Sequence, residues 1–267
     1  MQKIIDIHGH LGNINFVPFW AADGDKLADY CKKSGVDKLC LSASRAIMYD
    51  VREGNAELDA TLKAHDEFYG YVVVSPTFPD SLDDLKYLKT NKKFRGIKIH
   101  PDYHGYDLSV PSNFNFVDKV LNKTPMALFH CSCMPGSGFS PFATVVELAR
   151  RNPKTKIVAA HGAGLFQNGN YPFFPNLDSL EREAAKGLPK NLWVDTAHYL
   201  LYCYPTILQK LVDLAGADLV VYGTDAPLQG PMQMRFMAEL VESLDNSKTD
   251  KDKIFYKNAE KILGVKV

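Results

Sequence analysis

The sequence lacks long apolar runs and carries no net charge. No stretch of the 267 residues approaches the roughly 18 consecutive apolar residues that a membrane span requires. We also expect no N-terminal leader peptide, which would combine cationic residues with an apolar segment. The 31 basic side chains are balanced by 31 acidic ones, without a long run of either sign. Because nucleic acids and anionic membranes favour a strongly basic face, we expect neither as the main partner.

Cysteine is also scarce, and its spacing excludes the common metal and redox motifs. The chain has five cysteines, an odd number without C-x-x-C pairs, which we interpret as reduced thiols of a cytoplasmic protein. Cys131 directly follows His130, but a strand that points His130 inward leaves Cys131 on its other face. A metal site without cysteine ligands is therefore favoured. The cysteines are Cys31, Cys40, Cys131, Cys133 and Cys203.

The sequence does contain an unusual first strand. Residues 4–10 alternate isoleucines with Asp6 and His8 and end in His10. Side chains two apart share one face of a strand, so Asp6, His8 and His10 are expected to point the same way. Two neutral imidazoles this close together are half of a zinc-type site, which needs three or four such ligands. The alternative is a chance pair of histidines in an ordinary loop.

The rest of the chain alternates apolar strands with amphipathic helices. Further strands are expected over residues 36–42, 69–75, 94–101, 125–130, 156–162, 192–196 and 218–225. Helices are expected over residues 25–34, 53–68, 81–90, 114–122, 141–151, 177–186, 205–215, 232–244 and 251–263. This pattern predicts an α/β fold, the (β/α)8 TIM barrel, as a single domain over residues 1–267. A doubly wound sheet would favour a glycine-rich phosphate loop after the first strand, which is not found there.

Residue types that bind metals or transfer protons recur where the predicted strands end. They are His8 and His10 on the first strand, His100 on the fourth, His130 on the fifth, His161 on the sixth and Asp225 on the eighth. In a barrel of this kind, side chains at the carboxyl ends of separate strands converge. Each histidine alone is better explained as a capping or hydrogen-bonded core residue. Together they predict a metal centre.

These motifs resemble the amidohydrolase superfamily, and within it the amidohydrolase 2 branch, which is related to aminocarboxymuconate-semialdehyde decarboxylase. The matching segments follow the order of that family from the first strand to the last helix. They are Asp6–His10, Gly96–Pro101, Phe129–His130, Ala160–Gly162, Gly223–Pro227 and Tyr256–Leu263.

The resemblance implies one divalent metal ion, with zinc expected. Its ligands would be His8, His10, His130 and Asp225, and the implied catalytic residues are His161 and Asp225. A mostly imidazole shell with one carboxylate suits Zn²⁺, which can lower the pKa of bound water from about 15.7 to about 7. An imidazole at His161, with a pKa ordinarily near 6.5, could orient that water or take its proton.

Three further residues are predicted to bind the substrate. Arg45, Lys98 and His100 lie at or beside strand ends, where cations could hold the carboxylate of a small organic molecule. The alternative is that Arg45 and Lys98 pair with nearby acids such as Asp50 and Asp102. In some relatives a carboxylated lysine on the fourth strand bridges two metals, but the sequence around Lys98 favours the single-metal branch. Other candidate contacts on the expected mouth loops are Tyr103, His104, Tyr106, His198, Tyr199 and Tyr202.

Two chemistries remain open. The favoured one is metal-dependent hydrolysis of a small lactone, ester or amide by a metal-activated water. The first alternative is non-oxidative decarboxylation of an aromatic or unsaturated acid by a zinc-dependent lyase, and the second is an inactive binding barrel. Hydrolysis is favoured because it is the commoner chemistry of the superfamily and because the chain is shorter than typical decarboxylases. The expected partner is a small-molecule substrate, and formation of a homo-oligomer is left open.

Overall fold

The computed structural model describes residues 2–13, 22–131, 138–164, 177–197, 205–228 and 230–267. Its eight strands form one parallel sheet in which spatial order follows sequence order, from β1 to β8. The strands are β1 Ile5–Leu11, β2 Lys38–Ala43, β3 Phe68–Val73, β4 Phe94–Ile99, β5 Met126–Phe129, β6 Lys156–Ala159, β7 Leu192–Asp195 and β8 Val220–Val221.

The sheet closes on itself because the chain just after β8 lies beside β1. Gly9 and Ala226 form a parallel bridge there. The amide of His10 donates to the Ala226 carbonyl at 2.7 Å, and the amide of Asp225 donates to the His8 carbonyl at 2.8 Å. Closure of eight parallel strands confirms the predicted (β/α)8 barrel.

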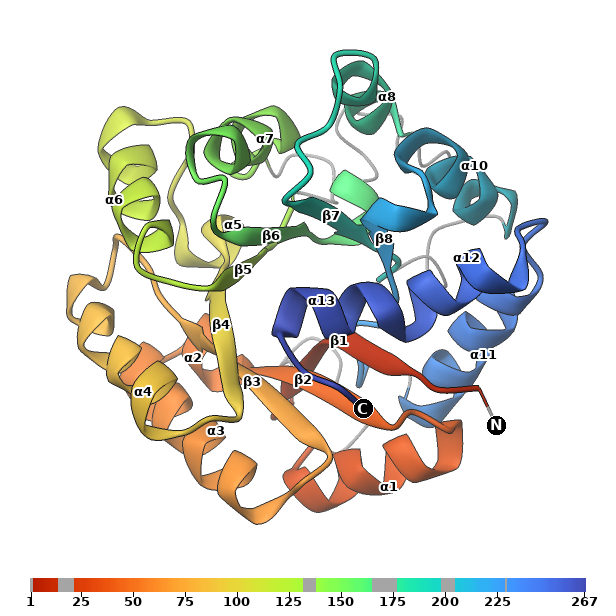
Figure 1. Cartoon of the computed structure of the whole chain (residues 1–267). Helices are drawn as coiled ribbons and strands as arrows, with labels where there is room; N and C mark the ends of the chain where they lie inside the picture. Colours follow the sequence, from red (N-terminus) through yellow and green to blue (C-terminus); the bar gives the residue numbers. More distant parts are fainter. Residues whose placement is uncertain (1, 14–21, 132–137, 165–176, 198–204, 229) are drawn as a thin grey trace.

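Helices surround the barrel on its outside (Figure 1). The α-helices are α1 Gly24–Ser34, α2 Ser44–Met48, α3 Val51–Ala64, α4 Tyr87–Thr90, α5 Pro101–His104, α6 Pro111–Leu121, α7 Phe142–Arg151, α8 Asp178–Ala184, α10 Pro205–Ala215, α11 Gly230–Glu242, α12 Lys248–Asp252 and α13 Asn258–Leu263. Short 3₁₀ helices cover Pro79–Lys86, His161–Ala163 and Ala217–Leu219. None of the helices in the described part of the chain is long and apolar enough to cross a membrane.

Some boundaries differ from those expected. The helix expected over residues 53–68 ends at Ala64, since Phe68 already begins β3. Most of the helix expected over residues 81–90 is a 3₁₀ helix. The eighth strand is much shorter than expected, since residues 217–219 form a 3₁₀ helix and the strand ends at Val221. Asp225, at the end of the expected strand, adopts a left-handed backbone conformation with φ 60°. The last expected helix is interrupted by a π-helical turn between α12 and α13.

Two apolar layers hold the barrel together. One lies between the strands and the surrounding helices. The other fills the barrel interior, where Ile5 and Ile7 of β1 and Trp193 of β7 pack with Ile262 and Leu263 of α13. In Figure 1, α13 lies across the end of the barrel at which both termini are found. This end, which we call the barrel floor, is therefore filled by apolar side chains.

An irregularity in β1 changes which face its side chains occupy. Just after Asp6, three steps along β1 oppose two steps along β2, which is the count of a β-bulge. Ile7 packs in the inner layer, so the neighbouring Asp6 lies on the outer face. Beyond the bulge, His8 and His10 both reach Asp225. The expectation that Asp6 shares a face with the two histidines is therefore wrong, because the extra residue reverses the alternation.

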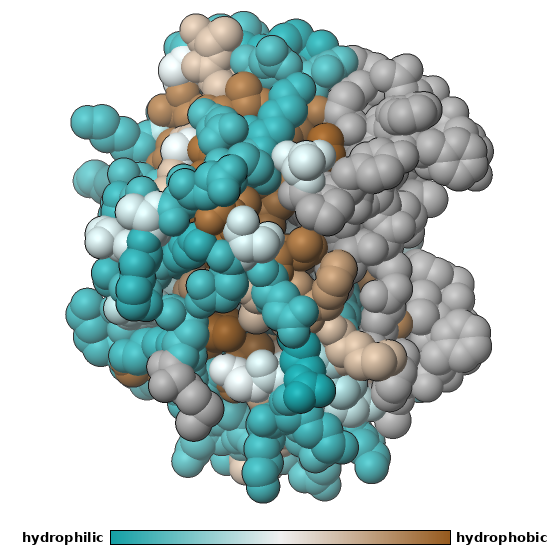
Figure 2. All heavy atoms as spheres, turned by 90° about the vertical axis from the view of Figure 1, so that its right-hand side faces the viewer, coloured by the Kyte–Doolittle hydropathy of each residue, from teal (hydrophilic) through white to brown (hydrophobic). Residues whose placement is uncertain are grey.

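The outer surface is mostly polar. In Figure 2, hydrophilic side chains cover most of the described face, and hydrophobic ones show mainly in the gaps between them. Cys131 is buried in the outer apolar layer, as expected from its position after His130. Cys133 and Cys203 lie outside the described residues.

Candidate active site

His8, His10 and Asp225 converge at the end of the barrel opposite the floor, which we call the mouth. Oδ1 of Asp225 lies 3.2 Å from Nε2 of His8 and 2.9 Å from Nε2 of His10. All three side chains are almost completely buried. Their ligand-type atoms are close enough together to hold a metal ion. Three of the four residues predicted as metal ligands are therefore brought together by β1 and the segment after β8.

His8 also contacts two other buried charged residues. Its Nδ1 lies 2.8 Å from Oδ2 of Asp195, at the end of β7. Its Nε2 lies 2.9 Å from Nζ of Lys98, on the inner face of β4. Lys98 thus contacts a histidine of the site.

The fourth predicted ligand, His130, lies beside His161. Nδ1 of His130 is 3.1 Å from Nε2 of His161, and its Nε2 is 3.3 Å from Oδ2 of Asp102. Among the described residues, the ligand-type groups that include His8 contain Asp225 with His10, or Asp195 with His161, but not His130. The role of His130 as a ligand therefore remains a prediction.

Backbone strain is concentrated at this end of the barrel. His161, Ala163 and Asp225 are the described non-glycine residues with positive φ, at 59°, 70° and 60°. Such conformations cost on the order of 1–3 kcal/mol each and persist only where the surroundings enforce them. Two of the three are predicted site residues.

A buried carboxylate stabilises the strained turn at Asp225. Asp6 accepts hydrogen bonds from the hydroxyl and the amide of Thr224, and from the amide of His8. On the other side, Gln233 donates to the carbonyl of Thr224. Burial raises the pKa of Asp6 to about 7, although the hydrogen bonds from Thr224 and His8 lower it. Asp6 therefore stabilises the turn that carries Asp225, and its position on the outer face of β1 allows it to contact Thr224.

Burial also keeps two histidines of the mouth neutral. It lowers the pKa of His10 to about 4, against the opposing effect of the Asp225 carboxylate. Burial, assisted by the neighbouring His130, lowers the pKa of His100 well below its usual range. His100 stacks on His130, with ring centroids 4.0 Å apart, and its Nδ1 accepts from the amide of Tyr103. A neutral imidazole can accept a hydrogen bond or bind a metal, which a protonated one cannot.

Comparison with known families decides the classification. A family model described as Amidohydrolase matches residues 5–265. The chain belongs to the amidohydrolase family. The resemblance to the amidohydrolase 2 branch, and the identity of the chain as an enzyme of this superfamily, are thereby confirmed. Among curated proteins, the search finds no match.

Solved structures of this family share the fold along their whole length. The 5-carboxyvanillate decarboxylase of Sphingomonas paucimobilis is 15% identical, with a TM-score of 0.70 and 100% of both chains covered. The 2,6-dihydroxybenzoate decarboxylase of Rhizobium is 13% identical, with a TM-score of 0.69 and 99% of both chains covered. A dihydroxybenzoic acid decarboxylase of Polaromonas, with bound manganese and the inhibitor 2-nitroresorcinol, is 14% identical, with a TM-score of 0.69 and coverage of 99% of this chain and 97% of that one.

The donor set of this amidohydrolase fits a divalent ion. Zinc binds histidine nitrogen and carboxylate oxygen at about 2.0–2.2 Å, so neighbouring ligand atoms of a tetrahedral site lie roughly 3.3 Å apart. The separations of 2.9 and 3.2 Å around Asp225 are close to that value. Nε2 of His8 already faces one cation, the Lys98 ammonium. Imidazole ligands suit zinc and carboxylate ligands suit manganese, so this mixed set does not select one of the two metals.

The other predicted substrate contacts differ in their exposure. Tyr103 is exposed and stacks on His100, with centroids 4.4 Å apart. His104 and Tyr106 are buried, so they belong to the packing of the barrel and not to an open loop. His198, Tyr199 and Tyr202 lie outside the described residues.

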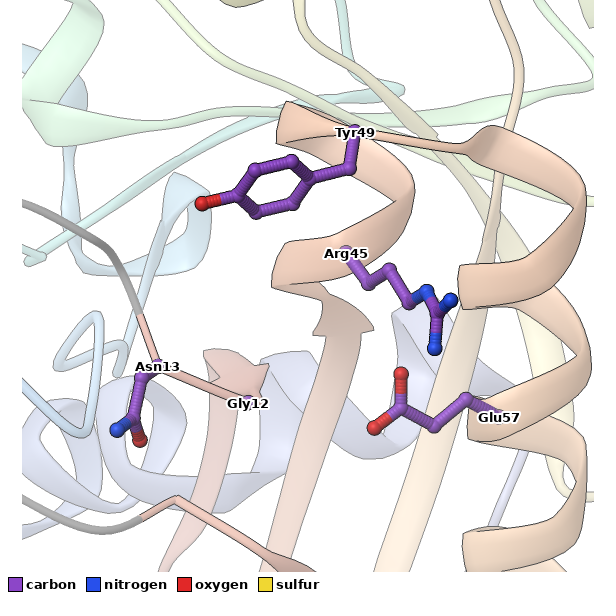
Figure 3. Close-up of a pocket in the computed structure, with 5 residues that line it drawn as sticks. All are labelled: Gly12, Asn13, Arg45, Tyr49 and Glu57. Atoms are coloured by element: carbon purple, nitrogen blue, oxygen red, sulfur yellow. The ribbon is translucent and has the colours of Figure 1, made fainter.

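Arg45 lies on the rim of the mouth. It forms an ion pair with Glu53, and not with Asp50 as considered from the sequence, and its side chain is 52% exposed. It lines an open pocket of about 440 Å³, in which its guanidinium and the carboxylate of Glu57 point towards one another (Figure 3). The pocket is lined by Gly12, Asn13, Arg45, Tyr49 and Glu57.

One residue of the mouth was given no role by sequence reasoning. Asp195 is completely buried and contacts both His8 and His161. A signal for it existed, because it ends the seventh strand, just as His130 and His161 follow the ends of β5 and β6. It was missed because no neighbouring motif distinguished this acid from the others in the chain.

Proposed function

We propose that this amidohydrolase is a metal-dependent, non-oxidative decarboxylase of a small aromatic or unsaturated carboxylic acid. The observation that carries the proposal is the convergence of His8, His10 and Asp225 beside His161 at the mouth of the barrel. Further support comes from the similar structures, which include two dihydroxybenzoate decarboxylases and a 5-carboxyvanillate decarboxylase.

One of the two arguments for hydrolysis no longer applies. It was that the chain is shorter than typical decarboxylases. The alignments, however, cover 97 to 100% of the decarboxylase chains that are named above. The chain therefore retains the counterpart of nearly the whole decarboxylase fold, so length no longer argues against this chemistry. Hydrolysis becomes the alternative outcome of the test.

In decarboxylation, the bond between the ring or alkene carbon and the carboxyl carbon breaks and carbon dioxide leaves. The electron pair of that bond remains on the carbon, which takes up one proton. A divalent ion held by His8, His10 and Asp225 would supply positive charge that holds the substrate and stabilises developing negative charge. One ion is expected, zinc or manganese, with His130 as the further predicted ligand.

The chain itself would bind the acid and handle the proton. The ammonium of Lys98, buried on the inner face of β4, carries three N–H donors and a positive charge suited to a substrate carboxylate. Arg45 would attract the anion at the rim. An imidazole nitrogen of His161 would hold the proton that the carbon takes up, because the pKa of histidine allows proton transfer near neutral pH. The apolar side chains beneath the site would limit access of water from the floor.

The test is a paired substrate panel. Purified protein, loaded with Mn²⁺ or Zn²⁺, is incubated with 2,6-dihydroxybenzoate, 5-carboxyvanillate and further aromatic and unsaturated acids, and released carbon dioxide is measured. A second panel of lactones, esters and amides is followed for hydrolysis. Metal-dependent release of carbon dioxide supports the proposal, whereas turnover of the second panel alone would replace it by hydrolysis.

Metal content is measured on the same preparation. Elemental analysis of protein never exposed to chelator is expected to find close to one equivalent of a divalent transition metal. Absence of metal would remove the central assumption of the proposal. Two equivalents would instead favour the two-metal arrangement with a carboxylated Lys98.

A further inference from the structure

We propose that Asp195 is a positioning residue that couples the metal ligand His8 to the catalytic residue His161. This inference rests on the roles that the proposed function gives to those two histidines. The carboxylate of Asp195 uses both of its oxygens. Oδ2 lies 2.8 Å from Nδ1 of His8, and Oδ1 accepts from the amide of His161 at 2.8 Å. One side chain thus holds the ring of one residue and the backbone of the other.

The contact with His8 sets which nitrogen of its ring is available to a metal. A lysine ammonium can only donate, so Nε2 of His8 must accept from Lys98, 2.9 Å away. The neutral ring then carries its proton on Nδ1, which donates to the Asp195 carboxylate. Two independent neighbours therefore select the same tautomer, with the lone pair on Nε2, the ring nitrogen that lies 3.2 Å from Oδ1 of Asp225. A carboxylate behind a metal-binding histidine orients the ring and makes it a stronger ligand.

The contact with His161 stabilises a strained backbone. His161 has φ 59°, a conformation that residues with a side chain rarely adopt. Its amide donates to Oδ1 of Asp195, and the same oxygen accepts from the amide of Ala197 at 3.1 Å. The sharp turn after β6 brings the imidazole of His161 to within 5.2 Å of that of His8, measured between ring centroids. Asp195 therefore fixes the turn on which the position of this imidazole depends.

Asp195 has little freedom to move. It is completely buried at the end of β7, and a β-carbon built on Gly223 would lie 3.2 Å from the β-carbons of both Asp195 and His8. This tight packing holds the carboxylate against the two histidines. Asp195 could also be considered a metal ligand, since it groups with His8 and His161. However, it faces Nδ1 of His8, whereas Asp225 and Lys98 face Nε2 on the opposite side of the ring.

The first test substitutes Asp195→Asn and measures binding of Mn²⁺. Asparagine has the same shape, but only one of its two polar atoms can accept, so one of the N–H groups now facing Asp195 meets another donor. We expect the affinity for Mn²⁺ to fall about 10- to 100-fold, the usual effect of losing the partner of a metal-binding histidine. The loss of the electron paramagnetic resonance signal of free Mn²⁺ gives the bound fraction without any reaction.

The matched control is Asp84→Asn. Asp84 is 2% exposed and accepts from Nδ2 of Asn55 at 3.0 Å, between α3 and the 3₁₀ helix after β3. It should lose stability without a change in affinity for Mn²⁺. If both variants bind Mn²⁺ as tightly as the wild type, the role of Asp195 is overturned. If the wild type itself binds no Mn²⁺, the proposed function fails first, and the coupling fails with it.

The second test is a double-substitution cycle at saturating Mn²⁺, with whichever substrate the panel identifies. Because Asp195 is expected to act through His161, Asp195→Asn should lower kcat more than tenfold in the wild type. In a His161→Asn background it should lower kcat by less than twofold. Multiplicative losses in the double variant would show that Asp195 acts independently of His161. They would overturn the coupling even if the affinity for Mn²⁺ had fallen.

Discussion

At the floor of the barrel, the strands enclose Ile5, Ile7 and Trp193, and α13 covers them with Ile262 and Leu263. At the mouth, the same strands enclose histidines, carboxylates and Lys98, most of them just as deeply buried. The strained non-glycine residues of the described chain all lie at the mouth. The floor is thus made of apolar side chains, whose burial lowers the free energy of the folded chain. The mouth is made of side chains whose burial costs free energy unless they are paired.

This difference indicates that the two ends of the barrel have different roles. Apolar packing at the floor supplies stability that the polar, strained mouth does not contribute. Pairing limits the cost of the mouth, since Asp6 and Asp195 each accept several hydrogen bonds. Substitutions at the two ends should therefore have opposite signatures, loss of metal and activity at the mouth and loss of stability at the floor.

The largest effect is expected from His8→Ala at the mouth. Removal of this ligand should abolish metal binding and activity together, with a rate loss on the order of 10³-fold or more, because a bound metal supplies several kcal/mol of transition-state stabilisation. Folding should persist, since the floor is intact. Metal analysis and circular dichroism on the same sample check both points. Retention of a full equivalent of metal would contradict the ligand assignment.

His161→Asn should separate catalysis from metal binding. The variant is expected to keep its metal and lose about 10²- to 10⁴-fold in rate, the contribution of a positioned acid–base group. Rate measurements and elemental analysis are made in parallel with the wild type. If the metal is lost as well, His161 is a ligand, and the division between ligands and catalyst at the mouth must be redrawn.

Ile262→Ala should show the opposite signature at the floor. Ile262 is 1% exposed in the inner layer, and truncating such a side chain typically costs about 2–5 kcal/mol. Urea denaturation of metal-free protein measures this loss. The folded fraction should still bind one equivalent of metal. A large fall in metal affinity would mean that the two ends of the barrel are not independent.

The smallest effect is expected from Arg45→Met on the rim. Its exposed ion pair with Glu53 should contribute less than about 1 kcal/mol to stability. If Arg45 attracts the substrate, KM for the acid should rise about tenfold, while KM for its methyl ester or amide should hardly change. Lys33→Met is the control, because Lys33 is an equally exposed, paired cation on α1. Equal losses on charged and uncharged substrates would restrict Arg45 to a structural role.

The order of the elements could be read from the sequence because it depends on local patterns. Alternating apolar residues predicted all eight strands within a few residues, apart from the shortened β8. The histidines of the mouth were found because each lies in or just after the carboxyl-terminal part of a strand. The bulge in β1 could not be foreseen, since it is defined by pairing with β2 and leaves the sequence pattern unchanged. As a result, Asp6 was assigned to the wrong face.

By itself the sequence determined the barrel, the family and most of the residues at the mouth, because strand period and residue type are local properties. Only the tertiary structure decided which of them meet. The contact between His8 and Asp195 joins residues 187 positions apart, and the one between His10 and Asp225 joins residues 215 apart. Such contacts exist only once the sheet has closed, because closure brings the first strand beside the last. The contacts of Asp6 and Asp195 therefore exist only in the closed barrel, although the position of Asp195 at the end of β7 could be read from the local pattern.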